Sequence, residues 1–505
     1  MSQSLPLLRY PEIVLGLAGP IGVDMAAITE SVDVSLRAVG YRSQLIRLTE
    51  EMTALDLPVS KGGNDFYSES LYKMRYGNEI CDFFGDRAAL GRIGVMAIRS
   101  RREAIAKAVG EQPVDRTAYI VRQLKRPEEV DFFRQIYGRQ FVLISAYGAR
   151  SQRHRLLQDM IRQSPSADMS SGEPSRLADL LIETDEKENA HAFGQQLRDT
   201  FHRGDVFIDG LSRPAMDAKL SRFVQALFGR ADIGPSKDEF GMYAAASAAL
   251  RSTDLSRQVG AAIFSADGEI VTQGCNEVPK AFGGAYWDSE EPDFRDVRLG
   301  YDPNALEIRV VLRDMFQKLS DANLLSEAAL KLGSPTEIVR SLTEKGGVLS
   351  EASVLDLTEY GRVVHAEMHA LCDAARLGRA VRGATLYCTT FPCHNCTKHI
   401  LAAGIRRVVY IEPYPKSLAK VLHAHEIEVD GEAASRVEFV PFLGISPLLY
   451  KDIFQKGRRK DQAGKAKRWY DDEEKPMVRV HYPTYLEMEK YALQPLLGRV
   501  KAGET

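Results

Sequence analysis

The chain has 505 residues, of which 44% are hydrophobic, and its 66 Lys and Arg nearly balance 69 Asp and Glu, for a formal net charge of −3. This length predicts more than one domain, and the near-neutral charge argues against a protein that coats nucleic acid. The sequence has no run of about 18 apolar residues and no basic-then-apolar leader, so we expect neither a membrane span nor a secretory signal. Six cysteines are too few for a disulfide scaffold, which favours a cytoplasmic protein with reduced thiols.

Strands alternate with helices over the first 235 residues, which predicts a mostly parallel α/β sheet. The first strand, 12–17, runs into a glycine-rich turn that contains Gly16, Gly19 and Gly22, and a helix is expected from about Asp24. The remaining elements expected in this part are strands at 43–48, 118–124, 141–145 and 205–208, helices at 92–109 and 127–137, and a mobile Ser-, Pro- and Gly-rich loop at 163–175.

A second domain is expected to begin near residue 236 and to end near 450. It should open with a helix at 240–252 and a strand pair whose turn lies at 266–268. Residues 278–360 mix polar loops with helices at 305–319 and 325–332, and we interpret them as an insertion. The regular order then resumes with a helix at 365–377, a strand at 384–389, a helix at 393–403 and a strand at 408–411. Residues 451–505 are expected to form a C-terminal extension with a basic run at 456–468.

Two short motifs carry the chemistry of the second domain, His365-Ala366-Glu367 and Pro392-Cys393-His394-Asn395-Cys396. Cys393 and Cys396 open a predicted helix, so both sulfurs can face one metal ion, and the helix N-terminus favours thiolates. With His365 they make three ligands, which leaves the fourth tetrahedral position open for water, as in catalytic zinc sites. Zinc lowers the pKa of such a water to about 7, and Glu367 is close enough in sequence to move its proton.

This combination is the signature of zinc deaminases. We therefore expect one Zn(2+) per chain, held by His365, Cys393 and Cys396, with Glu367 as the catalytic residue. A zincin peptidase would need Glu directly after the first His, and a structural zinc ribbon would need four closed ligands. The other histidines and cysteines are expected to serve packing or the surface rather than the metal; these are His369, His394, His399, Cys81, Cys275, Cys372 and Cys388, with the four cysteines expected to be buried.

From about 239 to 450 the sequence resembles the cytidine/deoxycytidylate deaminases, and the stretches 361–370 and 389–396 look closest to the deoxycytidylate branch. The layout of the whole chain resembles the bacterial anti-phage dCTP deaminases. The resemblance implies a P-loop-kinase-like parallel α/β domain (1–235) followed by an α/β/α cytidine-deaminase-fold domain with a large insertion. It also implies a homo-oligomer that converts deoxycytidine nucleotides, dCTP and also dCMP, to deoxyuridine nucleotides and ammonia, and so depletes dCTP during phage infection.

The resemblance also suggests residues that bind the substrate. Asn276 matches the position that hydrogen-bonds the sugar, and the alternative is an ordinary turn residue after a strand. Phe391 and Tyr414 fall near the base, where they could stack on it or serve only as core aromatics. Arg257 and Lys416 are candidates for the phosphate, and a structural surface role is the alternative for Arg257.

The glycine-rich turn departs from a working P-loop, which needs Lys and then Ser or Thr where this chain has Val23 and Asp24. Phosphoryl transfer is therefore not expected. The turn could still hold the anion of a regulatory nucleotide, or the domain could be a scaffold without a ligand. The basic run at 456–468 is either a solvated charged segment or a patch for phosphates or an inhibitory RNA, the RNA being suggested by the resemblance alone.

Three other functions compete with dCTP depletion. A housekeeping dCMP deaminase would use the same chemistry. A deaminase of tRNA or single-stranded DNA would want a basic channel with stacking aromatics, which the net charge disfavours. A nucleotide-binding regulator without activity would have no use for Glu367 beside a complete set of zinc ligands.

Overall fold

The structure is a computed structural model that describes residues 8–501 apart from 56, 110–111, 165–171, 189–190, 415, 432–434 and 471–472. The chain forms two compact units. Unit 1 comprises residues 1–243, 411–413 and 441–505, and unit 2 comprises 244–410 and 414–440. The segment 451–505, expected as a separate extension, therefore groups with unit 1. Among the described residues, no helix combines the length and the apolar content that a bilayer span requires.

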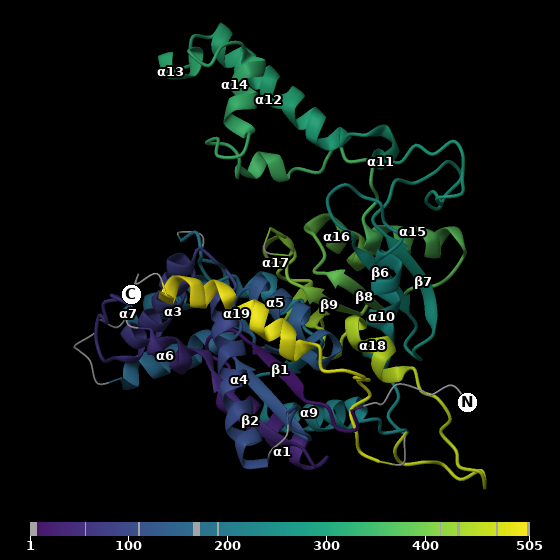
Figure 1. Cartoon of the computed structure of the whole chain (residues 1–505). Coiled ribbons are helices and arrows are strands. Elements are labelled where there is room, and N and C mark those ends of the chain that lie inside the picture. Colours follow the sequence, from purple (N-terminus) through teal and green to yellow (C-terminus); the bar gives the residue numbers. More distant parts are fainter. Residues whose placement is uncertain are drawn as a thin grey trace. The chain divides into compact units, whose positions relative to one another are not determined.

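The sheet of unit 1 has six strands in the order β12-β5-β4-β1-β3-β2 (Figure 1). All neighbouring pairs are parallel except β12 with β5, so the expected mostly parallel sheet is confirmed. The central strand β1 is buried along its whole length, as expected for a strand with helices on both faces. The strands are β1 (Ile13–Ala18), β2 (Arg42–Arg47), β3 (Thr117–Arg122), β4 (Phe141–Tyr147), β5 (Val206–Asp209) and β12 (Gly444–Ile445).

The helices of unit 1 follow the expected alternation, with several that the sequence analysis did not predict. Two of the predicted helices begin at recognisable sequence signals: Asp24 accepts two backbone N–H bonds at the start of α1, and Pro127 stands in the first turn of α5. The predicted loop at 163–175 is shorter than expected, because α6 ends at Gln163 and α7 begins at Glu173; residues 165–171 lie outside the described residues. The helices are α1 (Met25–Arg37), α2 (Leu48–Glu51), α3 (Phe66–Phe84), α4 (Ala89–Val109), α5 (Pro127–Tyr137), α6 (Arg150–Gln163), α7 (Glu173–Glu186), α8 (Leu197–Phe201), α9 (Arg213–Leu227), α18 (Pro447–Phe454) and α19 (Tyr485–Lys501). The helix α10 (Lys237–Ala249) spans the boundary between the two units.

The C-terminal helix α19 is tied to the sheet by a buried charged cluster. Arg102 of α4 bonds to Glu12 at 2.9 Å and to Glu489 of α19 at 2.6 Å, and all three side chains are at most 3% exposed. Tyr137 and Tyr485 donate hydroxyl bonds to the same two carboxylates. Figure 1 shows α19 in yellow beside α4, to which it packs. The last helix of the chain is therefore part of the core of unit 1.

Unit 2 has a second six-stranded sheet in the order β10-β11-β9-β8-β6-β7. The strand β6 is antiparallel to both β7 and β8, and Gly268 adopts a φ of +99° in the turn between β6 and β7. The helix α15 packs against β6 and β7. These elements are β6 (Gly260–Phe264), β7 (Ile270–Cys275), β8 (Thr385–Thr390), β9 (Arg407–Glu412), β10 (Ile427–Val429), β11 (Val437–Pro441), α15 (Ala366–Arg376), α16 (His394–Ala402) and α17 (Ala419–Leu422).

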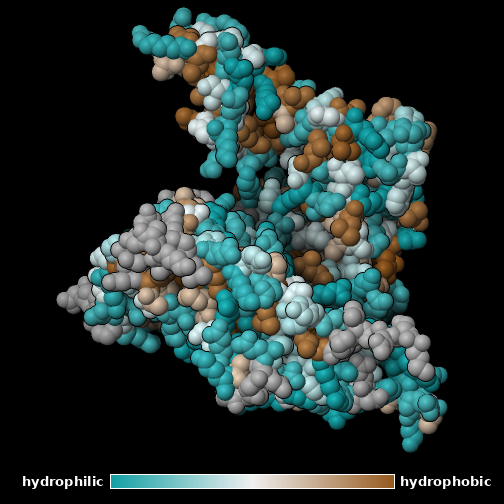
Figure 2. Space-filling view, viewed as in Figure 1, coloured by the Kyte–Doolittle hydropathy of each residue, from teal (hydrophilic) through white to brown (hydrophobic). Residues whose placement is uncertain are grey.

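The segment 278–360 of unit 2 contains α11 (Asp296–Leu299), α12 (Pro303–Asp321), α13 (Glu327–Leu330) and α14 (Pro335–Thr343). The helix expected at 325–332 is only the four residues of α13, while α14 was not predicted. The long helix α12 packs on α14 around a small apolar core of its own. The same segment also exposes many apolar side chains, and brown patches mark them in Figure 2.

Candidate active site

Two helix N-termini bring the zinc-ligand candidates together. His365 is the N-cap residue of α15 and Cys393 is the N-cap residue of α16. His365 Nδ1 lies 3.4 Å from Cys393 Sγ and 3.4 Å from Cys396 Sγ. Two ligands at ordinary zinc distances in a tetrahedron are about 3.6 Å apart. The three side chains therefore fit a shared zinc ion, and among the described residues they are the one such group of His, Cys, Asp and Glu side chains.

The two thiols are not electrostatically equivalent. The pKa of Cys393 is lowered to about 4, first because Cys396 donates a hydrogen bond to it and then because His365 lies beside it. The pKa of Cys396 is raised well above its ordinary value, because the charge and hydrogen bonding of Cys393 and burial favour its protonated form. One thiolate is thus already present without a metal, which suits a zinc-binding pair.

Glu367 lies in the first turn of α15, two residues after His365, and is 4% exposed. Burial raises the pKa of its carboxyl, and the nearby charge of Cys393 raises it further. Cys388, on the neighbouring strand β8, is also buried, and burial raises the pKa of its thiol. Glu367 is therefore a buried carboxyl beside the metal-ligand group. Carboxyl groups that act as general acids and bases typically lie in such surroundings.

A cavity of about 240 Å³ opens onto these residues. His365, Glu367 and Cys393 form part of its wall, and so do four of the five substrate-binding candidates, namely Arg257, Asn276, Phe391 and Tyr414. The other lining residues are Asp254, Leu255, Ser256, Val259, Asp296, Asp302, Asn304, Thr358, Gly361, Arg362, Val363, Ala366 and Thr390. The wall of the cavity thus combines charged and polar residues with the aromatic residues Phe391 and Tyr414.

The substrate-binding candidates differ in the contacts that their side chains already make within the protein. The Asn276 carboxamide accepts a bond from Val259 N and donates one to Arg257 O, each at 2.7 Å. Asn276 therefore holds the segment that carries Arg257 in place, in addition to facing the cavity. The Arg257 guanidinium lies 5.0 Å from the centre of the Tyr414 ring. Phe391 packs edge to face against Tyr410 within the core, which leaves Tyr414 as the more exposed aromatic face.

Lys416, the fifth candidate, does not line the cavity. Its ammonium pairs with Asp356 at 2.5 Å and its side chain is 61% exposed. His369 is buried, and its Nδ1 bonds to the carbonyl of Cys275 at 2.8 Å, as expected for a packing residue. His394 and His399 also lie outside the metal-ligand group. Of the four cysteines expected to be buried, Cys372 is exposed, because it lies on the face of α15 that turns away from the sheet.

The insertion contributes a wall that the sequence analysis missed, namely Asp296, Asp302, Asn304 and Thr358. Asp302 caps α12 by accepting a bond from Asn304 N, and the Asn304 carboxamide donates to the carbonyl of Leu357 at 2.8 Å. The start of α12 is therefore tied to residue 357, near the C-terminal end of the insertion. The only sequence signal was the Asp-Pro pair before α12, which predicts a helix start and says nothing of a cavity.

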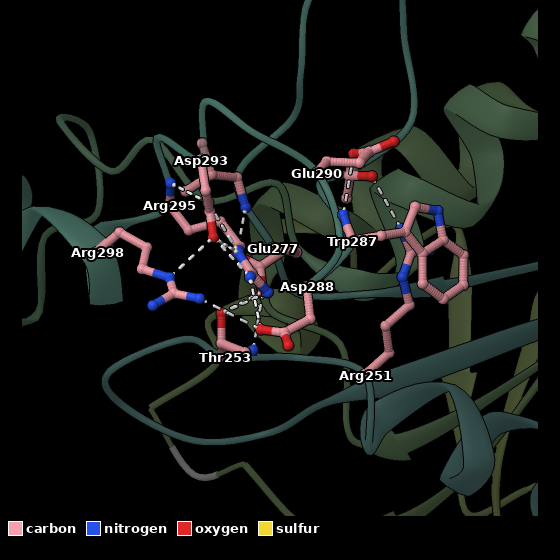
Figure 3. A network of polar contacts seen from close by, with 11 residues as sticks. Arg251, Thr253, Glu277, Trp287, Asp288, Glu290, Asp293, Arg295 and Arg298 are labelled. Carbon is pink, nitrogen blue, oxygen red and sulfur yellow. Dashed lines mark hydrogen bonds and ion pairs between the residues drawn. The ribbon is translucent and has the colours of Figure 1, made fainter.

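A dense polar network anchors the beginning of the insertion (Figure 3). Arg295 donates several bonds to the Asp293 carboxylate, including one of 2.6 Å, and both side chains are at most 4% exposed. These bonds hold the pKa of Asp293 well below its ordinary value. Thr253 donates both its N–H and its hydroxyl to Glu277 at 2.8 Å. Arg295 also donates to the Thr253 hydroxyl at 3.4 Å, and Arg362 donates to Asp296 at 2.8 Å, so these bonds tie the insertion to the body of unit 2.

Polar groups of the glycine-rich turn of unit 1 already have hydrogen-bond partners within the protein. Ile21 N donates to the buried Asp185 carboxylate at 2.7 Å, and Asp24 accepts the first free N–H groups of α1. Lys125 donates to Asp185 at 2.6 Å and to the carbonyl of Gly19 at 2.7 Å. An anion would meet a carboxylate where a working P-loop holds a phosphate, so the structure disfavours the expected anion site in this turn.

Two other expectations about unit 1 need correction. Gly16 lies inside β1 rather than in the turn, and a Cβ atom there would come within 2.8 Å of Leu124 and Phe141. This glycine therefore serves close packing. At the start of the basic run, Lys456 donates to the carbonyls of Arg230 and Ile233, each at 2.6 Å, so its ammonium is used within the fold.

Comparison with known proteins agrees with the geometry of unit 2. Residues 235–412 match the family model described as the cytidine and deoxycytidylate deaminase zinc-binding region. The deoxycytidylate deaminase of Enterobacteria phage T4 is 46% identical over 54 residues, which are 11% of this chain and 28% of that protein. ComE operon protein 2 of Bacillus subtilis is 43% identical over 53 residues, 10% of this chain and 28% of that protein. The human deoxycytidylate deaminase is 37% identical over 54 residues, 11% and 29% of the two chains.

The chain spans less than a third of the length of these curated relatives. Among solved structures, the dCMP deaminase from the cyanophage S-TIM5 in complex with dCMP and dUMP aligns at 19% identity and a TM-score of 0.23. The alignment covers 42% of this chain and all of that one. Residues 235–412 are thus similar to the zinc-binding region of cytidine and deoxycytidylate deaminases, and the group of His365, Cys393 and Cys396 that could hold a metal ion lies within this range.

Proposed function

We propose that this protein hydrolyses the C4 amine of deoxycytidine nucleotides, dCTP and also dCMP, and releases deoxyuridine nucleotides and ammonia. The observation that carries the proposal is a buried carboxyl, Glu367, in one cavity with a His-Cys-Cys group whose ligand atoms lie within 4.8 Å of one another. Three protein ligands with an open position are typical of catalytic zinc. The names of the relatives that match this region support deoxycytidine nucleotides as the substrate class.

In the proposed reaction His365, Cys393 and Cys396 hold zinc, which supplies a water molecule with a pKa near 7. Glu367 accepts a proton from water and returns it to the leaving amine, the role that a conserved Glu has in zinc deaminases. The burial of Glu367 supports this role, because a buried carboxyl is shielded from bulk water that would otherwise exchange the transferred proton.

The substrate contacts in the proposal follow from the cavity wall. Tyr414 offers an aromatic face for the cytosine ring, and Phe391 supports it from the core. Arg257 is placed for the phosphate. Asn276 faces the sugar and positions Arg257 through its backbone bonds. Lys416 has no place in this site, because it pairs with Asp356 outside the cavity.

The test is an end-point assay on the purified full chain with dCTP, dCMP, CTP, cytidine and a cytosine-containing oligonucleotide offered separately. We expect dCTP and dCMP to be deaminated, and Glu367→Gln to lower the rate by about 10²- to 10⁴-fold while zinc stays near one per chain. Glu359→Gln, an exposed carboxyl outside the cavity, is the matched control and should keep full activity. Conversion of the oligonucleotide alone would overturn the substrate class.

The finer part of the proposal is that dCTP is consumed in anti-phage defence by a homo-oligomer. The resemblance of the whole-chain layout supports it, and a housekeeping dCMP deaminase is the alternative with the same chemistry. The substrate panel separates the two, because the alternative predicts dCMP conversion without dCTP conversion. Light scattering on the purified protein measures the oligomeric state.

We also propose that unit 1 is a P-loop-kinase-like domain that does not transfer phosphoryl groups. The strand order around β1 and the glycine-rich turn between β1 and α1 support the likeness. Val23 and Asp24 stand where phosphoryl transfer needs Lys and a hydroxyl. Incubation with radiolabelled ATP should release no phosphate above a buffer blank, and turnover of ATP would contradict the proposal.

A further inference from the structure

The cavity of unit 2 has a second arginine in its wall that the sequence analysis did not single out. Arg362 lies three residues before His365 and lines the same cavity. Its side chain is 35% exposed. The wall therefore carries two guanidinium groups, those of Arg257 and Arg362. The substrate contacts proposed above use only the first of them.

The insertion holds the Arg362 guanidinium in place. Its Nη1 donates to the Asp296 carboxylate at 2.8 Å, and its Nη2 donates to the carbonyl of Phe294 at 2.8 Å. The Asp296 side chain is 8% exposed, so this ion pair is largely shielded from water. A guanidinium is planar and has five N–H donors. Within the described residues the Arg362 side chain makes only these two hydrogen bonds, so the remaining donors of an already oriented group are available to a ligand.

The two groups that hold this guanidinium lie on an anchored segment. Phe294 and Asp296 flank Arg295, which is 4% exposed in its side chain and belongs to the network in Figure 3. Arg295 donates to the buried Asp293 carboxylate at 2.6 Å and to the hydroxyl of Thr253, a residue outside the insertion, at 3.4 Å. A binding group with such support loses little freedom when a ligand binds, which favours affinity.

Carboxylates in the same wall oppose the binding of a phosphate. Asp254, Asp296 and Asp302 line the cavity. Burial raises the pKa of Asp296, and the charges of Asp302 and Asp254 raise it further, so the three carboxylates lie close enough to interact. A phosphate can bind beside them only where an arginine offsets their charge. A monophosphate carries about two negative charges, and a triphosphate carries more charge and more oxygens, which calls for a second cation.

We propose that Arg362, positioned by Asp296 and by the carbonyl of Phe294, binds the phosphates of the substrate beyond the first, which Arg257 binds, and that Arg362 thereby makes dCTP a better substrate than dCMP. This inference rests on the proposed deaminase function and deepens it, because it names the residue that responds to the length of the phosphate chain. Asp296 is a positioning residue, since it acts through Arg362. The insertion thus takes part in the choice of substrate.

Steady-state kinetics of the zinc-loaded full chain with dCTP, dCMP and deoxycytidine test the proposal. Arg362→Met should raise the KM for dCTP about ten- to a hundredfold, because it removes hydrogen bonds to a charged group. The KM for dCMP and deoxycytidine should change much less. The kcat should stay near the wild-type value, as expected when a contact of equal strength in the ground state and the transition state is lost. Arg362→Lys should restore part of the affinity for dCTP. Arg309→Met, an exposed arginine of α12 outside the cavity, should behave as the wild type does.

Two variants of Asp296 test its positioning role at equal charge. Asp296→Asn and Asp296→Ala both remove the negative charge, but only Asn keeps an oxygen that can accept a bond from Arg362. The KM for dCTP should therefore be about three- to tenfold higher for the Ala variant than for the Asn variant. Equal KM values for the two would overturn the positioning role. Thermal unfolding and zinc analysis show that each variant is folded and loaded.

The outcomes separate this inference from the proposed function. A folded Arg362→Met protein with the wild-type KM for dCTP overturns the inference, and so does a KM for dCMP that rises as much as the KM for dCTP. Failure of the proposed function would instead leave all three compounds unreacted by the wild type. Calorimetric titration with dUTP, which needs no turnover, tests Arg362 in that case as well. We expect weaker binding of dUTP by Arg362→Met than by the wild type, and equal binding overturns the inference.

Discussion

The cavity of unit 2 that is lined by His365, Glu367 and Cys393 (the zinc cavity) and the glycine-rich turn of unit 1 are built on the same local element. This element is the N-terminus of a helix that follows a strand or a loop. In unit 2, His365 and Cys393 cap α15 and α16, and their ligand atoms point to one shared position. In unit 1, the cap of α1 is Asp24, and Asp185 takes the N–H of Ile21. The comparison teaches that a motif can bind a metal ion or an anion only when its donor and acceptor groups are not already hydrogen-bonded to other parts of the protein.

The largest effect is expected from loss of a zinc ligand. Cys396→Ser should lower zinc from one per chain toward zero and reduce deamination on the order of a thousandfold or more, because the metal contributes several kcal/mol to the reaction. Metal analysis and the nucleotide assay measure the two effects. Cys372→Ser changes an exposed cysteine five residues after the catalytic candidate Glu367 on the same helix and should change neither. A Cys396→Ser protein with full zinc and full activity would contradict the ligand assignment.

Arg102→Met should be the most damaging change in unit 1. It leaves Glu12 and Glu489 buried without their shared cation, and breaking a buried pair costs about 3–5 kcal/mol. Denaturant unfolding followed by hydrogen exchange in α19 measures the loss. Arg99→Met, on a more exposed face of α4, should cost far less, and equal effects of the two changes would refute the importance of the cluster.

Asp185→Ala tests whether the glycine-rich turn depends on its hydrogen bond to Asp185. It removes the acceptor of Ile21 N–H and leaves the Lys125 ammonium without its carboxylate, so we expect unit 1 to lose about 1–3 kcal/mol of stability. Asp179→Ala, on the exposed side of the same helix, is the control. If the Asp185 variant were as stable as the control, the turn would not depend on its internal carboxylate.

Asn276→Ala should have a smaller effect on stability and a specific one on substrate binding. It removes two backbone bonds that hold the segment of Arg257, each worth about 1 kcal/mol. Steady-state kinetics should show a higher KM for the nucleotide together with a modest fall in kcat. An unchanged KM would argue that Asn276 neither touches the sugar nor positions Arg257.

The smallest effect is expected in the pH dependence of stability, from the ion pair between Asp293 and Arg295 in the insertion. The pKa of Asp293 is lower in the folded protein than the ordinary value of about 3.9. Its bonds to Arg295 should therefore stabilise fully above pH 4, and this contribution should be lost as the pH falls through the lowered value. The stability difference between wild type and Asp293→Asn should be constant from pH 7 to about pH 4 and shrink below it. A difference that fell already between pH 7 and pH 5 would contradict this assignment.

Much of the chain could be predicted from local pattern. The strand 12–17, the helix 127–137 and the alternating elements after residue 360 agree with the structure within a residue or two, because apolar periodicity and capping residues act over short distances. The His365 and Cys393-Cys396 motifs indicated a shared metal site, since the chemistry of zinc requires those side chains to meet whatever lies between them in sequence.

Other features depend on contacts between distant segments. No local signal placed β12 in the first sheet, α19 against α4, or Asp302 in the zinc cavity. The exposure of Cys372 and the pairing of Lys416 with Asp356 likewise follow from which neighbours each side chain meets. The same holds for the glycine-rich turn, whose missing Lys was evident in the sequence, while its closure by Asp185, 164 residues from Ile21, was not. The sequence by itself determined the elements with strong local periodicity and caps and the grouping of His365, Cys393 and Cys396 as metal-ligand candidates, because these depend on residue type and short spacing. Only the tertiary structure decided which polar groups are already paired and which face a cavity.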